Sequence, residues 1–497
     1  MTDPTRTISE PYDIAVIGGG INGVGIAADA AGRGLSVFLC ERDDLASHTS
    51  SASSKLIHGG LRYLEHYEFR LVREALAERE VLLAKAPHII RPLRFILPHQ
   101  PHLRPAWMIR AGLFLYDHLG KRKRLPASRR LRFGDDSPLK PSIRRGFEYA
   151  DCQVDDARLV VLNAMAAREK GAHIHTRTRC LNARQAGGLW HAELQQADGS
   201  RFTLRARVLV NATGPWVAQF LQENLQQPSP YGIRLVQGSH LIVPRLHDGE
   251  QAYILQSEDQ RIVFALPYLD RYTLIGTTDR DYQGDPAKAA VSEDEIRYLL
   301  QVCNAYFRRQ LTPQDILHSF AGVRPLRDDE SDDPAVVTRD YSLSLTTEQQ
   351  TPLLSVFGGK LTTYRRLAEA ALAQLRPYFP GMGAPWTACE SLPGGEGMST
   401  LQALAEELKA NVQGIDAALA QRWASLYGNR VWRMLGEART LAQLGDCLGQ
   451  DLYAREVDYL CREEWATQVE DILWRRTKLG LTFTPEERER LRRYLKP

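Results

Sequence analysis

The chain has 497 residues, of which 43% are hydrophobic and 25% are charged, and its formal net charge is +3. This length predicts two or three domains, and so small a net charge argues against a nucleic-acid partner. The seven cysteines form no C-x-x-C pair, which excludes the usual metal-ligand spacing and favours scattered thiols in a reducing compartment.

The first residues predict where the protein resides. Residues 1–10 show neither the apolar core of a secretory signal nor the arginine-rich pattern of a transit peptide. No segment offers 18 uninterrupted apolar residues, so we expect no membrane-spanning helix. A cytoplasmic protein, free or resting on a membrane, is the expectation.

A dinucleotide-binding turn opens the folded part of the chain. Residues 12–23 predict a buried strand, a Gly-x-Gly-x-x-Gly turn and the start of a helix that contains Asn22. Gly18 permits the tight turn, Gly20 lets the backbone approach a pyrophosphate, and Gly23 lets helix and strand pack closely. The phosphates would then bind at the helix N-terminus, where the dipole favours negative charge.

The second expected strand, 36–40, ends in Glu41. A carboxylate about 20 residues beyond the glycine turn accepts hydrogen bonds from ribose hydroxyls and repels a 2′-phosphate. The motif therefore predicts FAD or NAD and excludes NADP.

The middle of the chain alternates between helical and strand patterns. Apolar spacing predicts helices over 69–85 and 158–170, and a hairpin before a buried strand at 208–210. From 232 to 278 short strands follow one another, at 234–236, 240–243, 252–255, 262–266 and 272–275. They predict an antiparallel sheet inserted into the nucleotide-binding domain. Ser292 and Glu295 form a capping box at the start of a further helix.

These patterns predict an α/β fold with a discontinuous Rossmann-type domain over 1–75, 150–220 and 320–376. The inserted substrate domain covers 76–149 and 221–319. Prolines and glycines mark 377–398 as a linker, and 399–497 is expected to be all helix. This C-terminal domain would cap the fold or mediate a homodimer.

Two later segments extend the predicted cofactor site. Ala212 and Gly214 follow a buried strand, and a second strand that ends in Ala-Thr-Gly favours FAD over NAD, the alternative being a plain turn. At 358–365 a strand–turn–helix junction offers free N–H groups and a positive dipole to the electron-rich end of a flavin. Lys360 would strengthen that field, reach an anionic substrate, or simply be a surface lysine. The cofactor-binding residues at this junction are predicted to be Gly359, Leu361 and Thr362.

The chain resembles the FAD-dependent, respiratory glycerol-3-phosphate dehydrogenases in five motifs, which occur in the family's order. The motifs occupy 16–23, 51–64, 276–279, 322–326 and 357–365. The resemblance implies a FAD-binding domain of the D-amino-acid-oxidase type, a sheet-based substrate domain and a helical cap. It also implies hydride transfer from sn-glycerol 3-phosphate to FAD, giving dihydroxyacetone phosphate, with the electrons passed to a membrane quinone.

The resemblance further implies roles for individual residues. Ser53 and Ser54 would lie along the FAD, whereas Arg62, Arg324 and Lys360 would face the substrate. Forked, permanently charged guanidinium groups suit a phosphate dianion, although surface arginines in salt bridges would look the same in sequence.

Other side chains are candidates for contact with the substrate and for proton transfer. Tyr63 is a candidate hydroxyl donor, and Thr277 contacts substrate or flavin unless its turn only bonds its own backbone. His240 is our candidate general base, with His58 as the rival. A further alternative is that Arg324 orients the hydroxyl while the proton leaves through water. Arg324 and Lys360 are thus expected in both catalysis and binding.

Residues 104–132 combine an apolar, aromatic stretch at 107–116 with a basic run from 121 to 132. Each basic residue near an anionic leaflet contributes about 1 kcal/mol, so the segment is typical of a protein bound peripherally to the inner face of the cell membrane. The alternative is a core helix followed by a solvated loop.

Two rival functions stay open from the sequence. One is an oxidase of the same fold that acts on an amino acid or on glycerol 3-phosphate, with oxygen as acceptor. The other is a flavin-binding membrane adaptor or RNA-modification partner without turnover.

Overall fold

Parallel strands of almost fully buried residues form the centre of the first sheet in the computed structural model. The structure describes residues 10–61, 64, 67–100, 104–120, 123–257, 259, 261–328, 340–348 and 351–496. The strand order is β17(Ser342–Glu348), β18(Thr351–Phe357), β10(Arg201–Asn211), β1(Tyr12–Ile17), β2(Val37–Cys40) and β7(His173–His175). All these neighbours run parallel except β17, which is antiparallel to β18. Burial on both faces explains the continuous apolar runs in these strands.

Helices α1(Ile21–Gly32), α4(Asp156–Glu169) and α7(Tyr364–Leu375) pack together on one face of this sheet. The hairpin of β8(Arg179–Ala186) and β9(Leu189–Gln195) and residues 217–225 contribute to the apolar cluster on the other face. Gly25 of α1 lies against the ring of Tyr364 of α7, where a Cβ would come within 2.8 Å of the ring. Small residues in α1 therefore let these helices pack closely.

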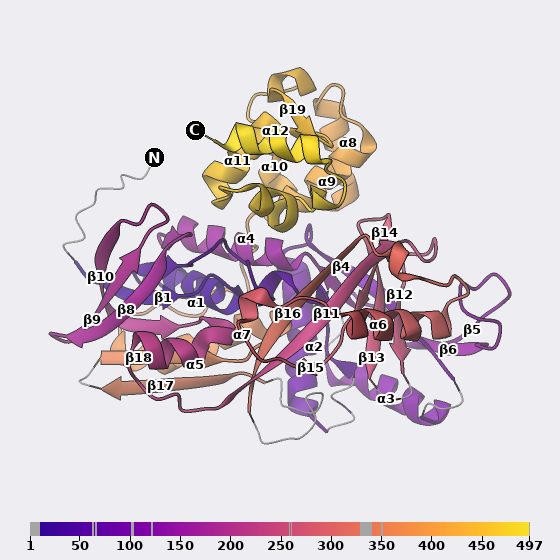
Figure 1. Cartoon of the computed structure of the whole chain (residues 1–497), viewed down its shortest axis with the longest axis horizontal. Helices are drawn as coiled ribbons and strands as arrows, with labels where there is room; N and C mark the ends of the chain where they lie inside the picture. Colours follow the sequence, from indigo (N-terminus) through magenta and orange to yellow (C-terminus); the bar gives the residue numbers. More distant parts are fainter. Residues whose placement is uncertain are drawn as a thin grey trace.

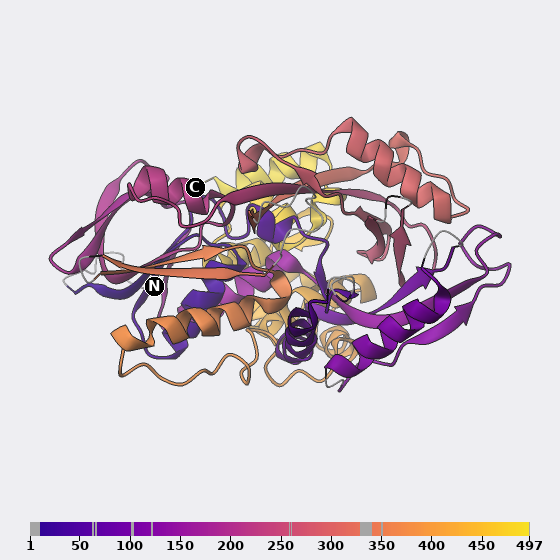
Figure 2. The ribbon, with the colours of Figure 1, turned by 90° about the horizontal axis from the view of Figure 1, so that it is seen from below.

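The second sheet is mostly antiparallel and lies beside the first (Figure 1). Its order is β15(Arg280–Asp281), β11(Ile233–Pro244), β14(Tyr272–Gly276), β13(Ile262–Tyr268), β12(Ala252–Gln256), β4(Ile90–Pro98), β6(Arg145–Val154) and β3(Leu56–Ile57). β16(His318–Arg327) pairs with β11, and β5(Arg129–Arg132) pairs with β6. α6(Glu293–Tyr306) covers one face of this sheet, while α2(Phe69–Lys85) and α3(Ala106–Leu119) lie on the other side (Figure 2).

Three expectations about these elements need correction. The two strands expected at 234–236 and 240–243 are one strand, β11, because the polar residues between them pair with β16 without interruption. For the same reason residues 320–327, expected in the nucleotide-binding domain, lie in the second sheet. The C-terminal region is not all helix, since 447–449 and 452–453 form a small hairpin whose turn residues Gln450 and Asp451 both have positive φ.

The C-terminal region packs as a separate helical layer over α4 (Figure 1). Its helices are α8(Leu401–Asn411), α9(Ala417–Tyr427), α10(Val431–Leu435), α11(Ala454–Glu464) and α12(Pro485–Leu495), and its hairpin strands are β19(Cys447–Gly449) and β20(Leu452–Tyr453). Glu487 and Thr484 form a capping box at the start of α12.

Buried ion pairs join this layer to the rest of the molecule. Arg476 donates to both carboxylate oxygens of Asp44, each at 2.8 Å, and Arg158 of α4 pairs with Glu464 of α11. Burial acts to raise the pKa of Asp44, but Arg476 and Arg475 outweigh burial and lower it. Asp44 lies four residues after the end of β2, so its ion pair with Arg476 lies beside the predicted cofactor site.

Among the residues that the structure describes, none of the helices combines the length and apolar character needed to cross a membrane.

Candidate active site

The glycine turn after β1 has the backbone geometry that a dinucleotide site needs. Gly18 has a φ of +114°, and a Cβ there would come within 2.4 Å of the Ala212 carbonyl oxygen. A Cβ on Gly23 would come within 1.9 Å of the Gly18 carbonyl oxygen. Both positions therefore require glycine, and the turn places the start of α1 beside the end of β10.

Glu41 lies at the end of β2 and is tied to the same turn. Its carboxylate accepts hydrogen bonds from the backbone N–H of Gly19 at 2.7 Å and of Asp43 at 2.9 Å. Burial raises the pKa of Glu41, and the two backbone donors oppose that effect. The side chain is thus fixed at the position where the sequence predicted a contact with ribose.

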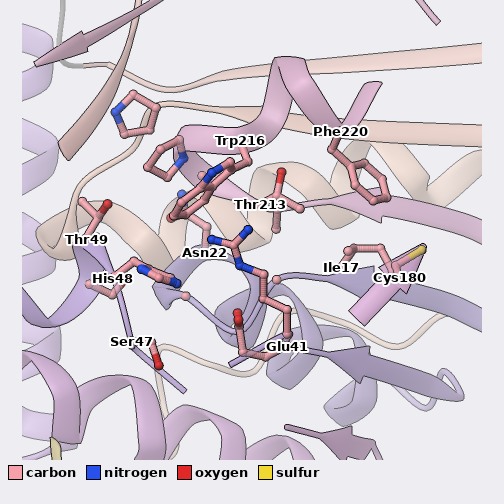
Figure 3. Close-up of a pocket in the computed structure, with 18 of the residues that line it drawn as sticks. Ile17, Asn22, Glu41, Ser47, His48, Thr49, Cys180, Thr213, Trp216 and Phe220 are labelled. Atoms are coloured by element: carbon pink, nitrogen blue, oxygen red, sulfur yellow. The ribbon is translucent and has the colours of Figure 1, made fainter. Parts of the chain in front are cut away.

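An open cleft runs from this carboxylate across the glycine turn to Gly359. Figure 3 shows Glu41, His48, Thr213 and Trp216 around this cleft, although they come from different segments of the chain. The guanidinium carbon of Arg42 lies 4.0 Å from the centroid of the Trp216 ring, and His48 meets the same ring edge-on. Gly18, Gly20, Asn22, Ala212, Gly214 and Gly359, all predicted to bind the cofactor, line the cleft.

Three of the residues in the cleft were not predicted from the sequence: Arg42, His48 and Trp216. Arg42 directly follows Glu41, and Trp216 stands two residues after Gly214, so nearness to these two predicted cofactor residues was the available signal for both. His48 lies seven residues beyond Glu41 and had no such signal.

The residues in the cleft fit FAD. Gly20 stands at the N-terminus of α1, where it has no side chain to cap the open N–H groups. Asn22 donates to the Gly358 carbonyl oxygen at 3.0 Å, while its own buried Oδ1 has no hydrogen-bond partner within the described part of the chain. A buried acceptor without a partner at a helix N-terminus is suited to a donor on a bound group.

Ser53 and Ser54 do not line this cleft. The Ser53 hydroxyl donates to Asp156 at 2.7 Å, and Asp156 also accepts from Lys55 at 2.8 Å. Ser54 Oγ lies 2.9 Å from His240 Nε2, which joins the loop after β2 to the second sheet. Their predicted contact with the cofactor stays a prediction.

His240 lies on β11 with 1% of its surface exposed, and its ring stacks on Phe320 with 4.9 Å between centroids. Its Nδ1 is buried and has no hydrogen-bond partner among the residues that the structure describes. Burial, together with the charges of Arg324 and Lys55, lowers the pKa of His240 well below its usual range. The ring is therefore neutral at physiological pH, the form in which a histidine accepts a proton. The rival His58 lies beside Thr362, whose hydroxyl accepts from the His58 N–H at 3.2 Å.

The side chain of Arg324, from β16, lies over Gly238 of β11. A Cβ on Gly238 would come within 2.3 Å of Nη2 of this arginine. The guanidinium donates to Asp279 at 2.5 Å and to Thr277 Oγ1 at 3.0 Å. Since Gly238 and His240 are two residues apart on one strand, they share a face, and Arg324 and His240 are neighbours there. The structure thus brings together Thr277, Arg324 and His240, and their predicted roles in catalysis and substrate binding stay predictions.

Lys360 is the N-cap residue of a short 3-10 turn, Leu361–Thr363, that leads into α7. Gly358 and Gly359 before it have φ of +72° and +102°, and a Cβ on Gly359 would come within 2.9 Å of Asn22. The close approach places the junction next to the start of α1. Arg62 and Tyr63 lie outside the described residues, and their predicted contacts with the substrate stay predictions.

Comparison with known proteins agrees with this geometry. Residues 13–365 match the model of the FAD dependent oxidoreductase family, and 386–495 match the C-terminal domain of alpha-glycerophosphate oxidase. The chain is 70% identical to a glycerol-3-phosphate dehydrogenase of Pseudomonas aeruginosa, over 99% of this chain and 96% of the relative. The chain belongs to the FAD-dependent glycerol-3-phosphate dehydrogenase family.

Two further similar proteins are informative. A D-erythritol 1-phosphate dehydrogenase of Brucella abortus is 51% identical, over 96% of each chain. The crystal structure of the glycerol-3-phosphate dehydrogenase of Bacillus halodurans with FAD is 26% identical, with a TM-score of 0.74 over 98% of this chain and 94% of that one. The predicted family, the α/β fold of the D-amino-acid-oxidase type and the FAD cofactor are therefore confirmed. The rival without turnover is set aside, because the chain is an FAD-dependent oxidoreductase.

Proposed function

We propose that this protein oxidises sn-glycerol 3-phosphate to dihydroxyacetone phosphate and passes the electrons through FAD to a membrane quinone. The observation that carries the proposal is the neutral, buried His240 next to the guanidinium of Arg324 on one face of the second sheet. A proton acceptor beside a fixed cation suits a secondary alcohol that carries a phosphate. The relative from Pseudomonas aeruginosa, at 70% identity, supports the same substrate.

Bound FAD supplies the chemistry of two-electron oxidation at the alcohol carbon. His240 accepts the hydroxyl proton, and Arg324, held by Asp279 and Thr277, binds the anionic substrate. If Nδ1 is the accepting atom, Nε2 carries the ring proton and donates it to Ser54, 2.9 Å away. The hydroxyl of Ser54 can accept this hydrogen bond, so the contact is compatible with the tautomer that the reaction requires. Lys360, at the N-cap of its turn, adds a second positive charge in this proposal.

The first test is anaerobic titration of the purified flavoprotein while the absorbance near the flavin maximum is recorded. We expect sn-glycerol 3-phosphate to bleach the flavin rapidly and its sn-1 enantiomer to be inert. D-erythritol 1-phosphate is the essential competitor, because a relative at 51% identity is named for it. Faster bleaching by that compound would overturn the substrate assignment, and bleaching by an amino acid alone would favour the amine-oxidase alternative.

The electron acceptor is tested on the bleached enzyme. We expect a quinone analogue to reoxidise the flavin in a single rapid phase, whereas air would act slowly and yield little hydrogen peroxide. Rapid reoxidation by oxygen with one peroxide per flavin would instead identify an oxidase.

We infer that α3 contacts the membrane, because this helix exposes several large apolar side chains, which is unusual for a helix that faces water. Trp107 is 67% exposed and Phe114 is 57% exposed, while Met108 and Leu115 are exposed beside them. Trp107 and Phe114 are seven residues apart, as are Met108 and Leu115, and because seven residues make about two helical turns, all four lie along one face of the helix. Basic residues flank these side chains: Arg104 precedes α3, Arg110 lies in it, and Lys123 and Arg124 follow it. Lys121 and Arg122 lie outside the described residues. Apolar side chains flanked by cations suit an anionic membrane surface.

Co-sedimentation with vesicles tests this contact. We expect binding to vesicles that contain anionic lipid, weaker binding to purely zwitterionic ones, and loss of binding in Trp107→Ser/Phe114→Ser with an unchanged flavin spectrum. Unchanged binding by that variant would show that α3 is not the contact.

A further inference from the structure

The second sheet contains a break in its ladder next to the active site. Pairing of β11 with β14 ends at His240 and Gly276, and pairing of β11 with β15 resumes at Gln237 and Arg280. Residues 238 and 239 on one strand therefore face 277, 278 and 279 on the other. The extra residue makes a bulge, a feature that re-aims side chains and is common beside active sites. Thr277 and Asp279, the two partners of Arg324, lie on this bulge.

At the bulge, the backbone N–H of Ser239 donates its hydrogen bond to a side chain. The N–H of Ser239 donates to the hydroxyl of Thr278 at 3.0 Å, in place of a carbonyl of the ladder. Ser239 and Thr278 are both buried, so the conformation of the bulge depends on what holds these two hydroxyl groups.

A single carboxylate holds them both. Glu295 Oε1 accepts from Ser239 Oγ at 2.8 Å and from Thr278 Oγ1 at 2.7 Å. Glu295 Oε2 accepts from Gln237 Nε2 at 2.8 Å and from the Ser292 N–H at 3.0 Å. The carboxylate thus joins the start of α6 to β11 on one side of the break and to the bulge on the other.

This set of contacts exceeds what a helix cap requires. Glu487 fills the same capping-box position in α12, yet its exposed carboxylate bonds to Thr484 and to Gln450 of a surface turn. Glu295 is 5% exposed and faces donors from two strands. Burial acts to raise the pKa of Glu295, but the hydrogen bonds from Thr278, Ser292 and Ser239 outweigh burial and lower it. The carboxylate is therefore ionised and accepts from every donor that faces it.

We propose that Glu295 is a positioning residue for the oxidation: by fixing the bulge at 277–279, its carboxylate sets Thr277 and Asp279 so that they hold Arg324 beside His240. The inference rests on the proposed function, since it assigns Glu295 a part in the same reaction. Glu295 itself lies on α6, on the opposite face of β11 from His240, because Gln237 and Ser239 alternate with Gly238 and His240.

The test uses the holoenzyme of Glu295→Gln, which keeps the shape and removes the charge, and of Thr278→Val, which removes one hydroxyl and leaves the α6 cap intact. Glu487→Gln is the matched control, because it makes the same change in the other capping box. Stopped-flow reduction by sn-glycerol 3-phosphate gives the limiting rate and the apparent Kd, and thermal unfolding and FAD content are measured alongside.

We expect Glu295→Gln to lower the limiting rate about 10-fold to 100-fold and to raise the apparent Kd, the size of effect that a misplacement near 1 Å produces. Thr278→Val should show the same defect to a smaller degree, and Glu487→Gln should match the wild type. Glu295→Gln and Thr278→Val within twofold of wild type in rate and Kd would overturn the inference. So would a loss of FAD with normal kinetics in the remaining holoenzyme. If the wild type itself is not bleached, the proposed function fails and the role of Glu295 fails with it, whereas a bleached wild type and a normal Glu295→Gln refute only the inference.

Discussion

Arg324 and Asp279 form an ion pair, with Nη1 of the arginine 2.5 Å from Oδ1 of the aspartate, while Nη2 of the same guanidinium donates to Thr277. The two residues come from β16 and from the bulge after β14, so the pair forms only when both strands have joined β11. A guanidinium held at two of its nitrogens keeps a fixed direction, which is what recognition of an anionic substrate requires.

Replacing Asp279 by Asn should release Arg324 from this direction. We expect the KM for sn-glycerol 3-phosphate to rise and kcat/KM to fall by about 100-fold, equivalent to about 3 kcal/mol, the upper range for a hydrogen bond to a charged group. Asp281→Asn is the matched control, since Asp281 pairs with Arg234 at 2.6 Å on the same sheet but is half-exposed. Equal losses in both variants would contradict a specific role for Asp279.

The pH dependence of flavin reduction should report His240. Burial and the charges of Arg324 and Lys55 lower its pKa, so its neutral form persists below the usual histidine pKa of about 6.5. We expect the limiting rate at saturating substrate to stay constant from about pH 8 down to about pH 6. An acid limb centred near 6.5 that disappears in His240→Asn would show that the ring titrates normally.

The same lowered pKa carries a prediction for stability. The unfolded chain binds a proton at His240 that the folded chain excludes, so stability is present above about pH 6.5 and is lost as the pH falls below that value. His88, whose pKa is lowered to about 3 mainly by burial, acts in the same direction. His88 should remove about 2 kcal/mol between pH 7 and pH 5, and His240 should add to this loss. The thermal unfolding temperature should therefore fall over this range, and less steeply in His88→Gln, if that variant folds.

Gly18→Ala should abolish FAD binding. An alanine there has a strained φ, and its Cβ would come within 2.4 Å of the Ala212 carbonyl oxygen, which forces β1 and β10 apart at the cofactor cleft. Gly34→Ala is the control, because Gly34 also has a positive φ of +86° but nothing lies within 4 Å of the added carbon. The control should lose about 1 kcal/mol of stability and keep its flavin. FAD content after gel filtration distinguishes the two.

Removing Arg476 should damage more than the C-terminal layer. Arg476→Met leaves the buried carboxylate of Asp44 with Arg475 as its remaining partner, a change that costs about 3–5 kcal/mol. Because Asp44 lies between Glu41 and the cleft residues Ala46 and Ser47, we expect the variant to bind FAD more weakly as well as to unfold at a lower temperature. Arg430→Gln breaks a partly exposed pair with Glu169 across the same interface and should cost at most about 1 kcal/mol. Normal FAD affinity in Arg476→Met would show that the interface and the cofactor site are independent.

The sequence by itself determined the parts whose chemistry is local. The glycine turn, Glu41 and the Ala-Thr-Gly segment predicted the cofactor and its position, because each depends on a strand and the few residues after it. Periodicity likewise predicted helix α2, and the spacing of Ser292 and Glu295 predicted the capping box of α6, because interactions between residues three or four apart decide both.

Only the tertiary structure decided which strands are neighbours. The sequence predicted two strands in place of β11, because the polar residues Gln237 and Ser239 interrupt its apolar pattern. In the structure, a buried carboxylate of α6 accepts hydrogen bonds from both side chains, so the strand continues through them. Three contacts at or near the site join residues that are between 45 and 432 positions apart in the sequence. They are the pairs Arg324 with Asp279, His240 with Ser54, and Asp44 with Arg476. No local pattern encodes such contacts, because they depend on how separate apolar faces pack, and that packing sets the register that brings these charges together.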